Sequence, residues 1–109
     1  MVNQEEGMAF IKVAKVHEIP PGQVRAFEVG DEDIVLCNVG GKVYAIANLC
    51  THDDGPLGEG ELIGSEIECP RHGARFDVQT GAVKSLPAIV PIPTFEVRVE
   101  GEDVWVDVE

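Results

Sequence analysis

The chain has 109 residues, and its 20 acidic side chains outnumber its 8 lysines and arginines, which gives a formal net charge of −12. This length fits a single domain with an ordinary hydrophobic core. The acidic balance argues against nucleic acid and anionic membrane surfaces as partners. No apolar run approaches the roughly 20 residues that span a bilayer, and residues 1–6 are too polar for a secretory signal. We therefore expect a cytoplasmic protein that binds neither membranes nor nucleic acid.

Short runs of β-forming residues alternate with turn residues along most of the chain, which is typical of an all-β domain. We expect residues 1–8 to be flexible and residues 9–109 to form one domain. The Gly40-Gly41 pair predicts a tight hairpin, and no segment has the periodicity of an amphipathic helix. The predicted strands, in chain order, are 9–14, 23–29, 34–39, 43–47, 62–63, 66–68, 75–78, 82–86, 95–100 and 104–108.

Two short motifs carry the side chains that bind transition metals. Cys50 and His52 form a C-x-H motif, and Cys69 and His72 form a C-x-x-H motif. Sixteen residues lie between His52 and Cys69. Thiolate and imidazole are ligands for zinc, copper and iron–sulfur centres. Since each motif follows a predicted strand, two loops that each offer one sulfur and one nitrogen can hold a single centre from two sides.

These motifs resemble the Rieske iron–sulfur site, in which two histidines replace two cysteines on one iron of a 2Fe–2S cluster. The likeness covers residues 10–108, and it is strongest in the segments 48–52 and 69–77. The chain is most similar to the Rieske ferredoxins of bacterial ring-hydroxylating dioxygenases. The resemblance implies a base of antiparallel sheets, in a sandwich or barrel, with an inserted cluster-binding subdomain at about 46–77. It also implies that Cys50 and Cys69 hold the inner iron, and His52 and His72 the outer iron.

Respiratory relatives of this family carry further groups around the cluster that are absent here. Their two extra cysteines, which form a disulfide, correspond to Gly55 and Arg71, and their two hydroxyl donors correspond to Ala74 and Phe76. A hydrogen bond to a charged group contributes about 1.5–3 kcal/mol. Losing two such donors therefore lowers the reduction potential by roughly 130–250 mV. We expect a potential near the low end of the Rieske range, which runs from roughly −150 to +300 mV.

The resemblance implies a monomeric electron carrier without a catalytic site of its own. It would take one electron at a time from an NAD(P)H-dependent flavin reductase and pass it to a terminal aromatic-ring-hydroxylating dioxygenase. A small Rieske subunit of an assimilatory NAD(P)H nitrite reductase is the alternative. A third possibility is an interaction module with a structural zinc, although zinc sites usually have two or more residues within each ligand pair. The catalytic dioxygenase subunit needs a much longer chain.

Several other residues have a predicted place. Cys37 lies in an apolar run and is expected to be an ordinary core residue. In the family, a loop at the position of Leu86-Pro87-Ala88 covers the cluster and limits its contact with water. Arg71 lies within the second motif and Arg75 follows it, and both are expected at the surface.

Overall fold

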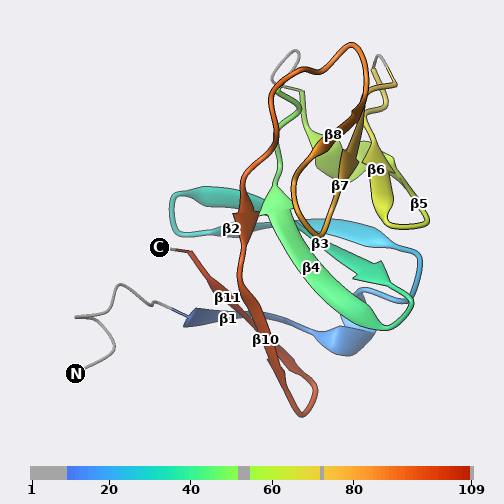
Figure 1. Cartoon of the computed structure of the whole chain (residues 1–109). Helices are drawn as coiled ribbons and strands as arrows, with labels where there is room; N and C mark the ends of the chain where they lie inside the picture. The colour runs from blue at the N-terminus through green and yellow to red at the C-terminus, as the bar shows by residue number, and fades with distance from the viewer. Residues whose placement is uncertain (1–9, 52–54, 72, 109) are drawn as a thin grey trace.

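The computed structural model describes residues 10–51, 55–71 and 73–108, and it contains three antiparallel sheets (Figure 1). We call them the lower, middle and upper sheets. The lower sheet has the order β1 (Phe10–Lys15), β11 (Asp103–Asp107), β10 (Val97–Glu100). The middle sheet has the order β2 (Val24–Val29), β3 (Glu32–Val39), β4 (Lys42–Ala47), β9 (Thr94–Phe95). The upper sheet has the order β5 (Glu61–Ile63), β6 (Glu66–Glu68), β7 (Arg75–Asp77), β8 (Val83–Ser85).

The described part of the chain contains only two short helical turns, the 3-10 turns η1 (Val16–Glu18) and η2 (Leu57–Glu59). Neither is long or apolar enough to cross a membrane, and no other helix occurs among the described residues. The expectation of an all-β fold built from antiparallel sheets is confirmed.

Strand β3 is buried on both of its faces because the middle sheet lies between two hydrophobic cores. Ile34 and Leu36 face the lower core, whereas Val35 and Cys37 face the upper core, and all four are fully buried. A strand that is covered on both faces loses the apolar–polar alternation of a half-exposed strand. Burial on both faces explains why residues 34–37 form a continuous apolar run.

The terminal hairpin follows the alternation of the sequence. Val97 pairs with Val106 and Val99 pairs with Val104, so these valines share one face of the lower sheet. Val104 and Val106 are buried on this face, whereas Val99, near the end of the hairpin, is 47% exposed. On the other side of β11, Ile11 of β1 pairs with Val106, and a bulge between Lys12 and Ala14 shifts the register. This bulge has no counterpart in the predicted pattern.

The single predicted strand 95–100 is wrong, because the structure divides it between two sheets. Phe95 pairs with Ala45 of β4 in the middle sheet, and Val97 pairs with Val106 in the lower sheet. Glu96 lies between the two short strands, and its carbonyl oxygen accepts a hydrogen bond from the backbone N–H of Asp107 at 2.9 Å. The chain therefore passes from one sheet to the other at Glu96, as strands do at the corners of packed sheets.

The upper sheet carries both metal-binding motifs on its connections. β5 and β6 form the predicted small hairpin, with Leu62 opposite Ile67. β7 continues the sheet with Phe76 opposite Ile67, and β8 adds the last strand, which ends at Ser85. The sheet thus extends beyond residue 77, where the sequence places the end of the cluster-binding subdomain.

Candidate metal centre

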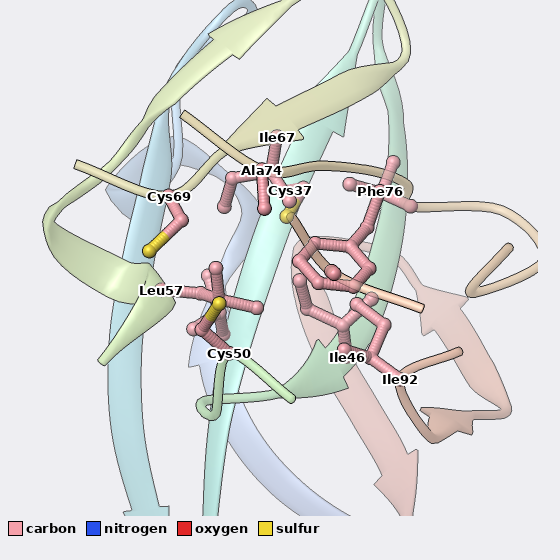
Figure 2. Close-up of a cluster of buried hydrophobic side chains, with 12 residues drawn as sticks. Cys37, Ile46, Cys50, Leu57, Ile67, Cys69, Ala74, Phe76 and Ile92 are labelled. Carbon is pink, nitrogen blue, oxygen red and sulfur yellow. The ribbon is translucent and has the colours of Figure 1, made fainter. Parts of the chain in front are cut away.

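Cys50 and Cys69 come from separate loops and lie in the same hydrophobic core. Cys50 lies three residues after the end of β4, and Cys69 directly follows β6. The exposed fractions of the two residues are 0% and 1%, and both belong to the upper core. Figure 2 shows their sulfur atoms on the same side of the core, near Leu57. None of Cys37, Cys50 and Cys69 forms a disulfide.

The two loops are closed in the same way. The backbone N–H of Cys50 donates to the carbonyl of Gly55 at 2.7 Å, and that of Cys69 donates to the carbonyl of Ala74, also at 2.7 Å. Each bond joins a cysteine to the residue five positions later. In the second loop, the N–H of Gly73 also donates to the carbonyl of Cys69 at 3.0 Å. Gly73 has a φ of 79°, a left-handed conformation that favours glycine.

His52 and His72 lie outside the described residues. In the sequence, each falls within one of the two closed loops, two residues after Cys50 and three residues after Cys69. The structure brings together the two cysteines of the predicted set.

Further residues that the motifs did not indicate hold the first loop against the middle and upper sheets. The Asn48 side-chain oxygen accepts a hydrogen bond from the backbone N–H of Gly58 at 2.7 Å. Leu57 is fully buried in the upper core. A Cβ at Gly60 would lie 2.1 Å from the carbonyl oxygen of Glu68, so only glycine fits there. The sequence signal was the pair of glycines flanking Glu59, but the contact they permit is with backbone of β6.

The segment that follows β8 packs beside the first loop. The Thr51 hydroxyl donates to the carbonyl of Val90, and Ala88 is fully buried in the upper core next to the cysteines. In Figure 1 this segment rises to the same end of the molecule as the two ligand loops. Leu86 and Ile89 are nevertheless 74% and 78% exposed. The segment is therefore anchored by the buried side chains of Ala88 and Ile92 and by the hydrogen bond at Val90, and it presents large apolar side chains outward.

The remaining groups of the upper core offer few polar atoms to a metal centre. Ala74 and Phe76 are fully buried and carry no hydroxyl. Cys37 is confirmed as a core residue on β3, and burial raises the pKa of its thiol to about 12. At neutral pH this thiol is protonated, so it is a poor metal ligand compared with a thiolate. Cys50 and Cys69 are the two other cysteines of this core that could serve as sulfur donors.

The residues present fit an iron–sulfur cluster of mixed ligation. Two thiols from two loops converge in a nonpolar core, and the two closed loops each include a histidine in their sequence. Thiolates are the usual ligands of iron–sulfur clusters, and in Rieske centres two histidines complete the set. A four-cysteine cluster does not fit, because the chain has only three cysteines and one of them, Cys37, lies on β3 within the core.

Comparisons with known proteins point to the same group. The Rieske [2Fe-2S] domain model matches residues 9–96. The chain is 46% identical, over 94% of its length and 95% of the relative, to the ferredoxin component of biphenyl 2,3-dioxygenase from Rhodococcus jostii (strain RHA1). It is 41% identical, over 90% of its length and 94% of the relative, to the ferredoxin component of the naphthalene 1,2-dioxygenase system of Pseudomonas aeruginosa.

Solved structures agree with this similarity. The ferredoxin of carbazole 1,9a-dioxygenase from Nocardioides aromaticivorans IC177 superposes with a TM-score of 0.88 at 38% identity, covering 93% of this chain and 99% of the other. A ferredoxin in a complex of reduced oxygenase and oxidized ferredoxin of carbazole 1,9a-dioxygenase superposes with a TM-score of 0.86 at 40% identity, covering 92% and 94%. These relatives favour an electron carrier over a nitrite reductase subunit. The chain therefore belongs to the Rieske [2Fe-2S] family as an electron-transfer ferredoxin, not a catalytic subunit, and its cofactor is one Rieske-type 2Fe–2S cluster.

Proposed function

We propose that this protein carries single electrons from an NAD(P)H-dependent flavin reductase to the terminal oxygenase of an aromatic-ring-hydroxylating dioxygenase system. The observation that carries the proposal is the convergence of Cys50 and Cys69 in one core, on loops of the same closure, in a chain similar along its length to dioxygenase ferredoxins. When bound, the cluster supplies a one-electron couple. The residues of this chain would hold the cluster, separate it from water and leave one side of it accessible to partners.

Four residues are proposed as the cluster ligands. Cys50 and Cys69, which are buried, would hold the inner iron. His52 and His72 would hold the outer iron, because the sequence places them inside the two closed loops at the end of the molecule that carries both motifs. A metal-bound imidazole leaves its second nitrogen free for solvent or a partner. The histidine side of the site would therefore be the point of electron entry and exit.

The apolar segment beside the first loop is a suitable docking surface for these partners. Ile89 and Val90 are 78% and 52% exposed, and the hydrogen bond from Thr51 to the carbonyl of Val90 ties them to the first ligand loop. Exposed apolar groups next to a redox centre allow brief contact that excludes water. The net charge of −12 would speed the encounter with a basic partner surface.

The composition and the core chemistry support the remaining parts of the proposal. Cysteines that form no disulfide suit a reducing compartment, so we place the protein in the cytoplasm. A transient carrier needs no permanent partner, and we propose that it acts as a monomer. Ala74 and Phe76 offer no hydroxyl to the cluster, which supports a low potential matched to a flavin donor.

Electron transfer to a Rieske oxygenase tests the proposal directly. Chemically reduced protein is mixed under anaerobic conditions with the oxidised terminal oxygenase of a biphenyl dioxygenase system, and the oxygenase spectrum is followed. We expect transfer, and we expect Val90→Glu to slow it at least tenfold at an unchanged potential. Val99→Glu is the matched control, since Val99 is 47% exposed on β10 in the lower sheet. Purified protein that contains zinc and no iron or sulfide would refute the proposal.

A further inference from the structure

The outward face of the upper sheet carries a cross-strand row of charged residues. Glu61 of β5 lies opposite Glu68 of β6, and Glu68 lies opposite Arg75 of β7. Two residues along the same strands, Glu66 lies opposite Asp77. Directly opposed residues share a face of a sheet and interact with each other. This face therefore holds four carboxylates around one guanidinium group.

Arg75 is paired with two of these carboxylates. Its Nε lies 3.7 Å from Oε2 of Glu68, and its Nη1 lies 3.9 Å from Oε1 of Glu66. The exposed fractions of the three side chains are 38%, 33% and 31%. Partly exposed pairs at such distances contribute only about 0–1 kcal/mol to stability. Stability is therefore not the main consequence of this arrangement.

The same row adjoins the second ligand loop. Glu68 directly precedes Cys69, and its Oε2 lies 3.7 Å from the position that a Cβ would take on Gly73. The Ser85 hydroxyl donates to the carbonyl of Gly73 at 3.4 Å. The Glu68 carboxylate therefore lies beside Gly73. Gly73 belongs to the segment 69–74, whose sequence includes two of the four proposed ligands, Cys69 and His72.

We propose that the charges of Glu68 and Arg75 set the reduction potential of the cluster in opposite directions. Reduction adds one negative charge to the centre, so a neighbouring carboxylate disfavours the reduced form and a neighbouring guanidinium favours it. Because both side chains are only about one-third exposed, solvent screens them less than it screens fully exposed charges. In β5, β6 and β7, all of which the structure describes, Arg75 is the only cation. The inference rests on the proposed assignment of Cys69 and His72 as ligands.

Redox titration of four variants tests this inference. We expect Glu68→Gln to shift the equilibrium with a reference couple three- to tenfold toward the reduced form, or about 30–60 mV. Arg75→Gln should shift it by a similar factor toward the oxidised form, whereas Arg75→Lys, which keeps the charge, should stay near the parent value. Glu100→Gln, a change of the same charge on β10, is the control and should leave the potential within a factor of about 1.5.

The dependence on ionic strength provides a second readout on the same samples. The Glu68→Gln and Arg75→Gln shifts should shrink as salt is raised from about 0.01 to 1 M, because the Debye length falls from about 30 to 3 Å. A purely structural role would change cluster content or thermal stability and leave the potential of the loaded fraction unmoved. Loaded variants with the parent potential would overturn the inference while the proposed function stands. Absence of an iron–sulfur cluster from the parent protein would instead remove the proposed function.

Discussion

The two hydrophobic cores on either side of the middle sheet differ in composition. Among the described residues, the lower core consists of buried aliphatic side chains from β1, β2, β3, β4 and β11, and it contains no cysteine. The upper core contains all three cysteines and the buried aromatic ring of Phe76 (Figure 2). Aliphatic cores of this kind need no cofactor to become stable. Apart from its residues on β3 and β4 of the middle sheet, the upper core is built from short strands and loops.

This difference indicates a division of roles within one small domain. The lower core and its long strands hold the middle sheet in place, and the upper core uses that sheet as one wall of the metal site. Alternate residues of β3 belong to the two cores, with Leu36 facing down and Val35 facing up. The cluster is therefore attached to a framework whose stability comes from elsewhere.

Removal of a sulfur ligand gives the largest expected effect and tests this division. Cys69→Ala should abolish the cluster and disorder the upper sheet, because metal binding and folding of such a unit are coupled. The lower and middle sheets should remain folded. Iron and sulfide analysis, visible absorption and hydrogen exchange of amides in β3 and β11 measure the two outcomes.

Cys37→Ala is the matched control for this change. Cys37 is a buried cysteine of the same core, but it lies on β3 and is not a proposed ligand. This variant should keep a full cluster. Loss of the cluster from Cys37→Ala, or complete unfolding of Cys69→Ala, would contradict the separation of the two cores.

Truncation of neighbouring residues on β3 sharpens the comparison. Leu36→Ala removes buried volume from the lower core and should lower the free energy of unfolding by about 2–5 kcal/mol. The visible spectrum of the cluster should not change. Val35→Ala removes a smaller side chain from the upper core, so its cost should be lower, but iron should be released faster on exposure to a chelator.

Urea unfolding and the rate of iron loss are measured on both variants. Each change is made in a fully buried residue of the same strand, so each serves as the control for the other. If Leu36→Ala accelerates iron loss as much as Val35→Ala, the two cores do not act separately.

Much of the fold could be predicted because each strand of this chain carries a strong local pattern. The valines of the terminal hairpin alternate with polar residues, and the structure pairs Val97 with Val106 as that alternation predicts. The continuous apolar run of β3 was also correctly placed in a core. The position of β3 between two separate cores could not be predicted from its apolar residues alone, because any strand covered on both faces has the same pattern, and such strands occur in several folds.

The features that could not be predicted depend on contacts between distant segments. The chain changes sheet at Glu96 because β4 lies beside the first part of 94–100 and β11 lies beside the second part. Apolar and polar residues alternate in the same way in either sheet, so the sequence does not show where the change occurs. For the site, Cys50 and Cys69 were predicted as ligands from their spacing, and the structure places both in one core. The support from Asn48 and the pairing of Arg75 with Glu68 arise only when β4, η2, β6 and β7 come together.

Restoring a hydrogen-bond donor to the upper core is expected to have a moderate effect. Phe76→Tyr adds a hydroxyl at the position where respiratory relatives place one. If this hydroxyl reaches the cluster or the sulfur of a ligand, the potential should rise by roughly 60–125 mV, because a bond to a charged group contributes about 1.5–3 kcal/mol. Spectroelectrochemical titration measures the shift.

Phe27→Tyr makes the same chemical change against the lower core. Phe27 lies on β2 and packs against the residues of that core. Its substitution should leave the potential at the parent value. Equal potentials for the parent and the loaded Phe76→Tyr protein would show that the hydroxyls are not what separates low-potential from high-potential members.

The smallest effect concerns the one thiol of the upper core that is not a proposed ligand. Burial raises the pKa of Cys37 to about 12, from 9.0 for an exposed thiol. A raised pKa in the folded state means that the stabilisation is fully present below pH 9 and is lost as the pH rises toward 12. At pH 10 the loss should be about 1.4 kcal/mol relative to neutral pH, because the unfolded chain then releases a proton that the folded chain retains. The difference in urea midpoint between the parent and Cys37→Ala should change accordingly between pH 8 and 10, and a constant difference would mean that water reaches Cys37 in the folded protein.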